Sequence, residues 1–252
     1  MKKINQIFQS WKPNTVFTSN YLESNGFYRQ LLNKYVHSNW LERIGKGAYI
    51  KKGDKIDLFG ALNAIQEQLE LPIYIGGKTA LLIQGLGHYI NDNIPYIELY
   101  SLNSSRLPNW FLEYNWETEI IYSTSNLFGK EIIGLERKDI SSVSILISSP
   151  ERAIFELLNN LNNRISFYET YKIFENLYNL RPELLNELLS KCESIKVKRL
   201  FLYFSEKSDH FWFEDLDLSR INLGSGKREI YKNGILDKKY LITVPKDLDN
   251  EI

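Results

Sequence analysis

Four cationic side chains, Arg43, Lys46, Lys51 and Lys52, stand within residues 40–54, which read WLERIGKGAYIKKGD. Side chains of this type bind phosphate groups, because clustered Lys and Arg release counterions from a nucleic-acid backbone. Two short apolar runs flank Gly45-Lys46-Gly47, a pattern that predicts a hairpin whose glycines allow a tight turn and a close backbone approach. The segment therefore predicts a basic hairpin facing phosphates.

The charge of the whole chain is unevenly distributed. The 252 residues carry no formal net charge, yet residues 1–55 contain ten basic and three acidic side chains, a formal charge of +7. The remainder therefore carries −7. A cationic first part favours a polyanionic partner, and a solvated basic surface is the alternative.

The elements before the hairpin indicate how it is used. Residues 1–11 fit a short amphipathic helix, a second helix begins at Thr18 or Ser19 and stops at Asn25-Gly26, and a third spans Tyr28 to His37. Helix, turn, helix and basic hairpin is the order of a winged helix-turn-helix, whose second motif helix enters the major groove. We expect a DNA-binding domain over 1–55 that contacts DNA through the polar face of the third helix (Arg29, Gln30, Asn33, Lys34 and His37) and the wing (Arg43, Lys46, Lys51 and Lys52).

The rest of the chain, 56–252, predicts a larger mixed α/β domain, so the fold class is α+β. Its apolar spacing indicates helices and strands in alternation, a helix-rich middle and a β-hairpin at the end. The segment 197–204 fits a buried helix or a strand, because Leu200 to Phe204 are apolar on every face, and the spacing of Val197, Leu200, Phe201 and Phe204 favours a helix. Asn233-Gly234 predicts a type I′ turn that joins 229–231 to 240–244.

Composition limits the compartment. A lone cysteine, Cys192, excludes an internal disulfide and a multi-cysteine zinc site. No apolar run approaches the length of a membrane span. We expect a soluble cytoplasmic protein without a membrane partner.

Several motifs resemble catalytic sites without completing one. Gly76-Gly77-Lys78-Thr79 resembles a phosphate loop, but Pro72 stands where the first glycine is required, so a sharp turn before a buried helix is the better interpretation. The histidines His37, His88 and His210 lie far apart, which argues against a metal site or a nucleophilic triad.

Two acidic motifs are treated in the same way. Glu136 and Lys138 have the spacing found in some magnesium nucleases, and Asp215 with Asp217 has metal-binding chemistry, but neither has an evident partner. The order of Gly224-Ser225 and these aspartates is the reverse of that in nucleotidyltransferases. We predict no catalytic residue, no metal and no cofactor.

A second group of basic residues lies in the last quarter of the chain. It comprises Lys191, Lys196, Lys198, Arg199, Arg220, Lys227, Arg228, Lys232, Lys238 and Lys239. Either a second phosphate-facing surface or solvated helix and hairpin edges account for it, and charge alone slightly favours the second.

Longer strings of sequence resemble one family nearly end to end. NYLESNGFYRQLLNKYVHSNWLERIGKGAY, DLFGALNAIQEQLELPIYIGGKTALLIQGLGHY, SSPERAIFELL, VKRLFLYFSE and INLGSGKREIYKNGILDKKYLITVP are similar to segments of the AbiEi antitoxins of type IV toxin-antitoxin systems. The resemblance implies an autorepressor that binds double-stranded operator DNA and counteracts a cognate AbiEii-type nucleotidyltransferase toxin, without an obligatory stable complex. It also implies positive surface outside residues 1–55, at Lys196, Lys198, Arg199, Lys227 and Arg228.

Two alternatives remain open at this point. One is a winged-helix regulator whose large domain senses a small ligand. The other is a magnesium-dependent nuclease that uses Glu136, Lys138 and a remote carboxylate.

Overall fold

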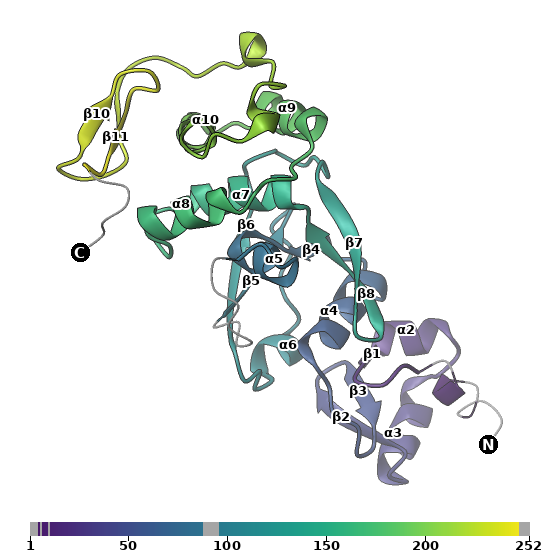
Figure 1. Cartoon of the computed structure of the whole chain (residues 1–252). Helices are drawn as coiled ribbons and strands as arrows, with labels where there is room; N and C mark the ends of the chain where they lie inside the picture. Colours follow the sequence, from purple (N-terminus) through teal and green to yellow (C-terminus); the bar gives the residue numbers. More distant parts are fainter. Residues whose placement is uncertain (1–4, 6, 10, 88–95, 247–252) are drawn as a thin grey trace. The chain divides into compact units, whose positions relative to one another are not determined.

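The computed structural model describes residues 5, 7–9, 11–87 and 96–246 (Figure 1). The chain mixes helices and sheets, which confirms the α+β class. It forms two compact units: the first is Met1–Tyr74, Asn103–Ile120 and Arg137–Leu146, and the second is Ile75–Leu102, Ile121–Glu136 and Ile147–Ile252. Within the described residues, no helix has the length and apolar character needed to cross a bilayer. His88 lies outside the described residues.

The helix-turn-helix and the wing occur where the sequence predicts them. Residues 5 and 7–9 are helical, and the rest of the helix expected over 1–11 is not described except for Trp11, which is not helical. The following elements are β1 (Phe17–Thr18), α2 (Ser19–Ser24), α3 (Arg29–His37), β2 (Leu41–Gly45) and β3 (Ala48–Lys51). The three strands form an antiparallel sheet of order β1-β3-β2, and β2 and β3 make the wing (Figure 1).

Local chemistry sets the turn between α2 and α3. The hydroxyl of Thr18 accepts a hydrogen bond from the backbone N–H of Tyr21 at 3.3 Å and caps the start of α2. Gly26 adopts φ 82°, and the N–H of Phe27 then donates to the carbonyl of Leu22 at 2.9 Å. A left-handed glycine after a helix reverses the chain at low cost, so α3 starts only a few residues later.

The head, which we define as residues 5–56, has its own apolar core. Its buried members are Ile7, Trp11, Phe17, Leu22, Phe27, Leu32, Leu41 and Tyr49. The rings of Trp11 and Phe17 stack with centroids 4.0 Å apart. Each fully buried large apolar side chain contributes about 1.5–3 kcal/mol, so this cluster fixes α3 against the sheet.

A second sheet has five strands in the order β6-β5-β4-β8-β7. They are β4 (Ile73–Ile75), β5 (Tyr96–Ser101), β6 (Glu119–Thr124), β7 (Leu135–Ile140) and β8 (Val143–Ser148), with β4 and β8 parallel at Ile75 and Ile147. Helix α4 (Leu58–Glu67) is capped by Asp57, whose side chain accepts from the N–H of Gly60 at 2.6 Å. The sequence did not predict β7, β8 or the short helix α6 (Asn109–Glu113).

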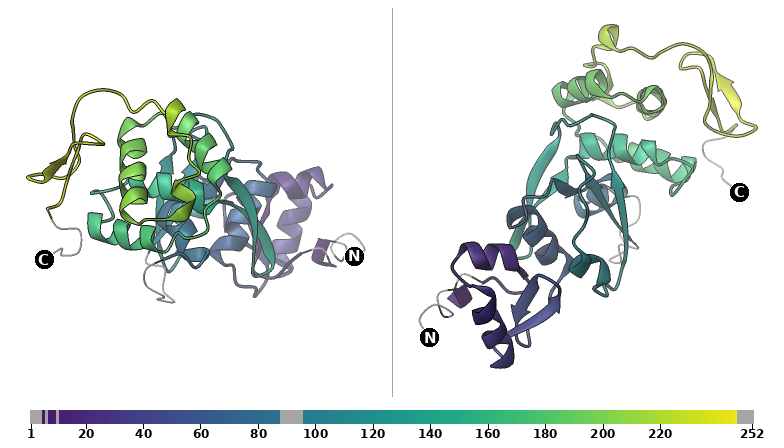
Figure 2. Two further views of the ribbon diagram at one scale, coloured as in Figure 1. Left: turned by 45° about the horizontal axis from the view of Figure 1, so that its top comes forward. Right: turned by 180° about the vertical axis from the view of Figure 1, so that it is seen from behind.

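Helices dominate the second unit. They are α5 (Gly77–Ile83), α7 (Pro150–Asn159), α8 (Phe167–Glu175), α9 (Pro182–Lys191) and α10 (Ile195–Lys207), and the green helices α7 to α10 lie together in Figure 1 and in both views of Figure 2. The ambiguous run 197–204 is part of α10, which confirms the helix. All residues from Val197 to Ser205 are buried, Lys198 and Arg199 included, and this explains why Leu200 to Phe204 show no polar face.

The end of the chain corrects one prediction. After two short 3₁₀ turns, η1 (Phe211–Phe213) and η2 (Leu218–Arg220), come β9 (Arg228–Glu229), β10 (Ile235–Asp237) and β11 (Ile242–Val244). The hairpin joins β10 to β11, whereas β9 pairs with β11 in parallel. Gly234 lacks the positive φ of a type I′ turn, and a Cβ there would lie 2.2 Å from the carbonyl oxygen of Val244. Close approach of β11, not turn geometry, therefore requires this glycine.

Candidate nucleic-acid interface

Helix α3 exposes most of the side chains expected to contact DNA. Arg29, Gln30, Lys34 and His37 are exposed, while Asn33 is half-buried. On the opposite side of the helix Leu32 is only 1% exposed and packs into the head's core. The amphipathic division predicted from spacing is thus present, and four of five polar residues are accessible to a partner.

Asn33 and Arg43 are bound to each other. The Nη2 of Arg43 donates to Oδ1 of Asn33 at 3.0 Å and to the hydroxyl of Tyr49 at 3.1 Å, and the guanidinium lies 5.4 Å from the centre of the Tyr49 ring. Two hydrogen bonds and an aromatic contact hold the guanidinium in one place. The arrangement presents Arg43 between the third helix and the wing.

The wing turn carries Lys46 outward. Gly47 adopts φ +89°, which a residue with a side chain rarely does, and its carbonyl accepts from the N–H of Ser19 at 2.8 Å. This backbone bond fastens the wing tip to the start of α2. Lys46 is exposed at that tip.

The structure separates Lys51 and Lys52 from this turn. Lys51 pairs across the hairpin with Leu41, at the end remote from Gly45-Gly47. Its ammonium donates to the carbonyl of Trp11 at 3.2 Å and lies 5.5 Å from the Phe8 ring, so it stabilises the head internally. Lys52 forms an ion pair with Glu42 at 2.8 Å.

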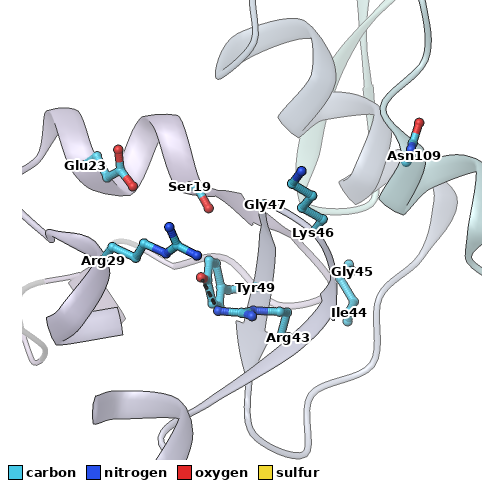
Figure 3. A pocket seen from close by; sticks show the side chains of 10 residues that line it. All are labelled: Ser19, Glu23, Arg29, Arg43, Ile44, Gly45, Lys46, Gly47, Tyr49 and Asn109. Carbon is cyan, nitrogen blue, oxygen red and sulfur yellow. Dashed lines mark hydrogen bonds between the residues drawn. The ribbon is translucent and has the colours of Figure 1, made fainter. Parts of the chain in front are cut away.

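A cavity of about 790 Å³ lies between α2, α3, the wing and α6 (Figure 3). Figure 3 shows its lining residues: Ser19, Glu23, Arg29, Arg43, Ile44, Gly45, Lys46, Gly47, Tyr49 and Asn109. Three cations and one carboxylate face a single hollow, so the hollow carries a net positive charge, which suits a polyanion such as DNA.

Sequence reasoning missed four polar members of this cavity. Ser19 and Glu23 lie on α2, and their helical spacing places them on one face. Tyr49 was assigned only to the apolar run of the hairpin. Asn109 is more than fifty residues beyond the head, and nothing in the sequence pattern connects it with the wing.

The prediction of a second basic surface is wrong for two of its five residues. Arg199 is 1% exposed and Lys198 is 5% exposed. Arg199 donates from Nε to the carbonyl of Leu223 at 2.8 Å and from Nη1 to that of Gly226 at 2.7 Å, so it anchors the chain after α10. Arg199 can be buried on the apolar helix α10 because these carbonyls accept the hydrogen bonds that its guanidinium would otherwise make to water.

The other three members do not form a comparable cluster. Lys196 is half-buried, and burial lowers the pKa of its ammonium, which donates to the carbonyl of Asn159 at 3.4 Å. Lys227 and Arg228 are exposed next to each other in the chain. Only this adjacent pair remains as accessible positive charge from the set.

Gly76-Gly77-Lys78-Thr79 has a packing role. The N–H of Gly77 donates to Oε2 of the buried Glu156 at 3.0 Å, and a Cβ on Gly76 would lie 2.3 Å from that oxygen. Lys78 forms an ion pair with Glu169. The glycines therefore make room for a buried carboxylate, in agreement with the interpretation as a turn before a buried helix.

Glu98 is a second buried carboxylate in the same unit. Burial raises its pKa, and nearby Glu156 adds to the rise, against hydrogen bonds from the backbone of Thr79 and Lys78 that lower it. Glu156 is itself held by Arg152, whose Nε donates to Oε1 at 2.9 Å. These groups form a buried polar network inside the unit.

The acidic motifs have structural partners. Glu136 lies 3.7 Å from Arg181, and Asp217 accepts from Ser219 and lies 3.2 Å from Arg220. Among the residues described, no three of His, Cys, Asp and Glu come together as metal ligands.

A helix-turn-helix followed by a two-stranded wing defines the winged-helix class, and the described head has this architecture. Residues 1–92 match the family model "Transcriptional regulator, AbiEi antitoxin N-terminal domain", and residues 95–245 match "Transcriptional regulator, AbiEi antitoxin, Type IV TA system". The chain therefore belongs to the AbiEi family of transcriptional regulators and antitoxins, which confirms the resemblance.

One solved structure gives independent support for the fold. The crystal structure of the RV2827C protein from Mycobacterium tuberculosis matches with a TM-score of 0.63 at 13% sequence identity, covering 96% of this chain and 89% of that one. Such a likeness concerns the fold alone. No curated protein sequence matches the chain.

Proposed function

We propose that the chain binds the double-stranded operator DNA of its own operon and represses it, and that it counteracts a cognate AbiEii-type nucleotidyltransferase toxin. The observation that carries the first half is the cavity between α3 and the wing, where Arg29, Arg43 and Lys46 face one hollow. Family membership supports the second half. No catalysis by this chain is required, and its site of action is the cytoplasm.

The exposed side chains divide into two roles. Arg29, Gln30, Lys34 and His37 point away from the head's core on α3 and read base edges in the major groove. Arg43 and Lys46 hold phosphates, and Asn33 positions Arg43. In this assignment residues 1–55 form the DNA-binding domain and residues 56–252 the antitoxin domain.

The DNA half is tested by binding at several salt concentrations. The purified full-length protein is titrated with a duplex from immediately upstream of its coding sequence, with a scrambled duplex of equal length as competitor. We expect tight binding that survives the competitor and weakens linearly on a log–log plot against salt. Arg29→Ala should cost about 1–3 kcal/mol on the upstream duplex and little on the scrambled one.

Equal, weak binding to both duplexes would overturn operator recognition. The toxin half is tested separately, by inducing the neighbouring toxin gene in cells with and without this chain. Growth restored by the full chain, and also by the Arg29→Ala variant, would support an antitoxin activity that is independent of repression. No rescue by the full chain would overturn it.

A further inference from the structure

Helix α6 lies directly against the wing. A Cβ built on Gly45, in β2, would lie 2.7 Å from the Cβ and 3.0 Å from the Cα of Trp110. Gly45 does not have a positive φ, so its backbone conformation would admit a side chain. The reason for glycine here is that the backbones of β2 and α6 meet.

The short helix is firmly held. Trp110 is 2% exposed and Phe111 is fully buried. The Phe111 ring lies 5.0 Å from that of Trp116, whose indole N–H donates to the carbonyl of Phe111 at 2.7 Å. Two buried aromatic anchors and a hydrogen bond make α6 a fixed support, not a loose loop.

Asn109, the first residue of α6, faces the cationic cavity. It is exposed, and it lines the same hollow as Arg29, Arg43 and Lys46. Both residues line the cavity, and Figure 3 shows that Lys46 and Asn109 belong to different elements of the chain. The cavity thus has a wall that neither the helix-turn-helix nor the wing provides.

We propose that α6 is a third DNA-contacting element, in which the side-chain amide of Asn109 donates a hydrogen bond to a phosphate oxygen next to the phosphate bound by Lys46. This inference rests on the proposed function. A phosphate is the expected acceptor because the wing tip and its surroundings contact the backbone, whereas α3 reads the bases. Arg106, exposed three residues before Asn109, adds a cation to the same segment.

The proposed contact extends the DNA-binding surface of the protein beyond the N-terminal domain. Asn109 lies within residues 95–245, which match the second family model, and not within residues 1–92, which match the N-terminal domain. In this proposal, a residue outside the N-terminal domain contributes to DNA binding. A head isolated from α6 would lack both this contact and the support behind the wing.

The test compares full-length variants on upstream and scrambled duplexes across a salt series. Asn109→Ala should weaken binding to both duplexes by about fivefold and leave the salt slope unchanged, because a neutral amide releases no counterion. Asn109→Asp should weaken both at least tenfold, since it places a carboxylate beside phosphates. The matched control, Asn115→Asp, changes an exposed residue that does not line this cavity and should stay within twofold.

Two failures are distinguishable. If the wild-type protein shows no preference for the upstream duplex, the proposed function fails. If the wild type and Lys46→Ala behave as expected while both Asn109 variants bind like wild type, only the third element is wrong. Loss on the upstream duplex alone would also overturn the phosphate contact, because it would indicate base recognition.

Discussion

The guanidinium of Arg43 is hydrogen-bonded to the side chain of Asn33, with 3.0 Å between Nη2 and Oδ1. This contact joins the wing to the third helix through two residues that the sequence suggested as independent DNA ligands. Because the Asn33 oxygen already accepts this hydrogen bond, we infer that Asn33 acts on DNA binding through Arg43.

A double-mutant cycle tests that task. Asn33→Ala should weaken DNA binding by about 1 kcal/mol. Without its partner, the Arg43 side chain moves freely in the unbound protein and therefore loses more conformational entropy when it binds DNA. In the Arg43→Ala background the same change should have almost no effect, giving a coupling energy of about 1 kcal/mol. Additive losses would mean that Asn33 contacts DNA itself.

Lys46 and Lys52 offer a matched comparison within the wing. Lys46→Ala should weaken binding to all sequences alike and reduce the salt slope by about one, the signature of one lost phosphate contact. Lys52 is paired with Glu42 and does not line the cavity, so Lys52→Ala should leave the slope unchanged. If Lys46→Ala and Lys52→Ala gave the same salt slope, the assignment of the phosphate contact to the wing tip, and not to the opposite end of the hairpin, would be contradicted.

Glu23 is the acidic side chain of the cavity, and no ion pair involving it is found among the described residues. We expect Glu23→Gln to raise the affinity for scrambled DNA about three- to tenfold, because a carboxylate facing phosphates opposes non-specific binding. The preference for the upstream duplex should fall. Glu187→Gln, the same change of charge at an exposed position on α9, is the control; a similar rise there would attribute the effect to net charge.

Arg199 should matter for stability instead of binding. Arg199→Met removes the donor of hydrogen bonds to the carbonyls of Leu223, Gly226 and Leu241 and leaves them without this partner. The free energy of unfolding should fall by about 2–4 kcal/mol in urea denaturation. Arg228→Met, at an exposed position, should stay within about 0.5 kcal/mol. If Arg199→Met were as stable as wild type, the assigned anchoring role would be wrong.

Low pH should lower the stability of the second unit, because it protonates the carboxylate of Glu151. Burial would raise the pKa of this carboxyl, but hydrogen bonds from the Arg181 side chain and backbone outweigh burial and lower it below its ordinary value of 4.5. The stabilisation is therefore present above about pH 4.5 and is lost as the pH falls through the lowered folded-state pKa. When the free energy of unfolding is measured against pH, Glu151→Gln should reduce the loss of stability at low pH. Glu136→Gln, which changes a carboxylate 3.7 Å from the same Arg181, should change that loss little.

The sequence was sufficient for the head because its signals are local. Thr18 and Gly26 mark the two ends of α2 through caps, and the spacing of apolar residues around Leu32 sets the buried face of α3. Such signals act over a few residues, so periodicity and turn chemistry reveal them.

The missed features depend on contacts between distant residues. Charge counting placed Arg199 on a surface, but backbone carbonyls 24 to 42 residues further along satisfy it inside the protein. Asn109 reaches the cavity only because Trp110 packs against Gly45. The final sheet was mispredicted for the same reason, since Gly234 reads as a turn residue when the approach of Val244 is unknown.

The order β10-β11-β9 places β11, the last strand among the described residues, in the middle of its sheet. Removing the residues from Ile242 onward would leave both β9 and β10 without a partner at once. The carbonyl of Leu241, just before this strand, also accepts from Arg199 on α10. Proteolysis or an early stop codon near this point would thus disrupt the whole three-stranded sheet and not only an edge strand. An affinity tag should therefore be attached beyond residue 246, after the last described residue.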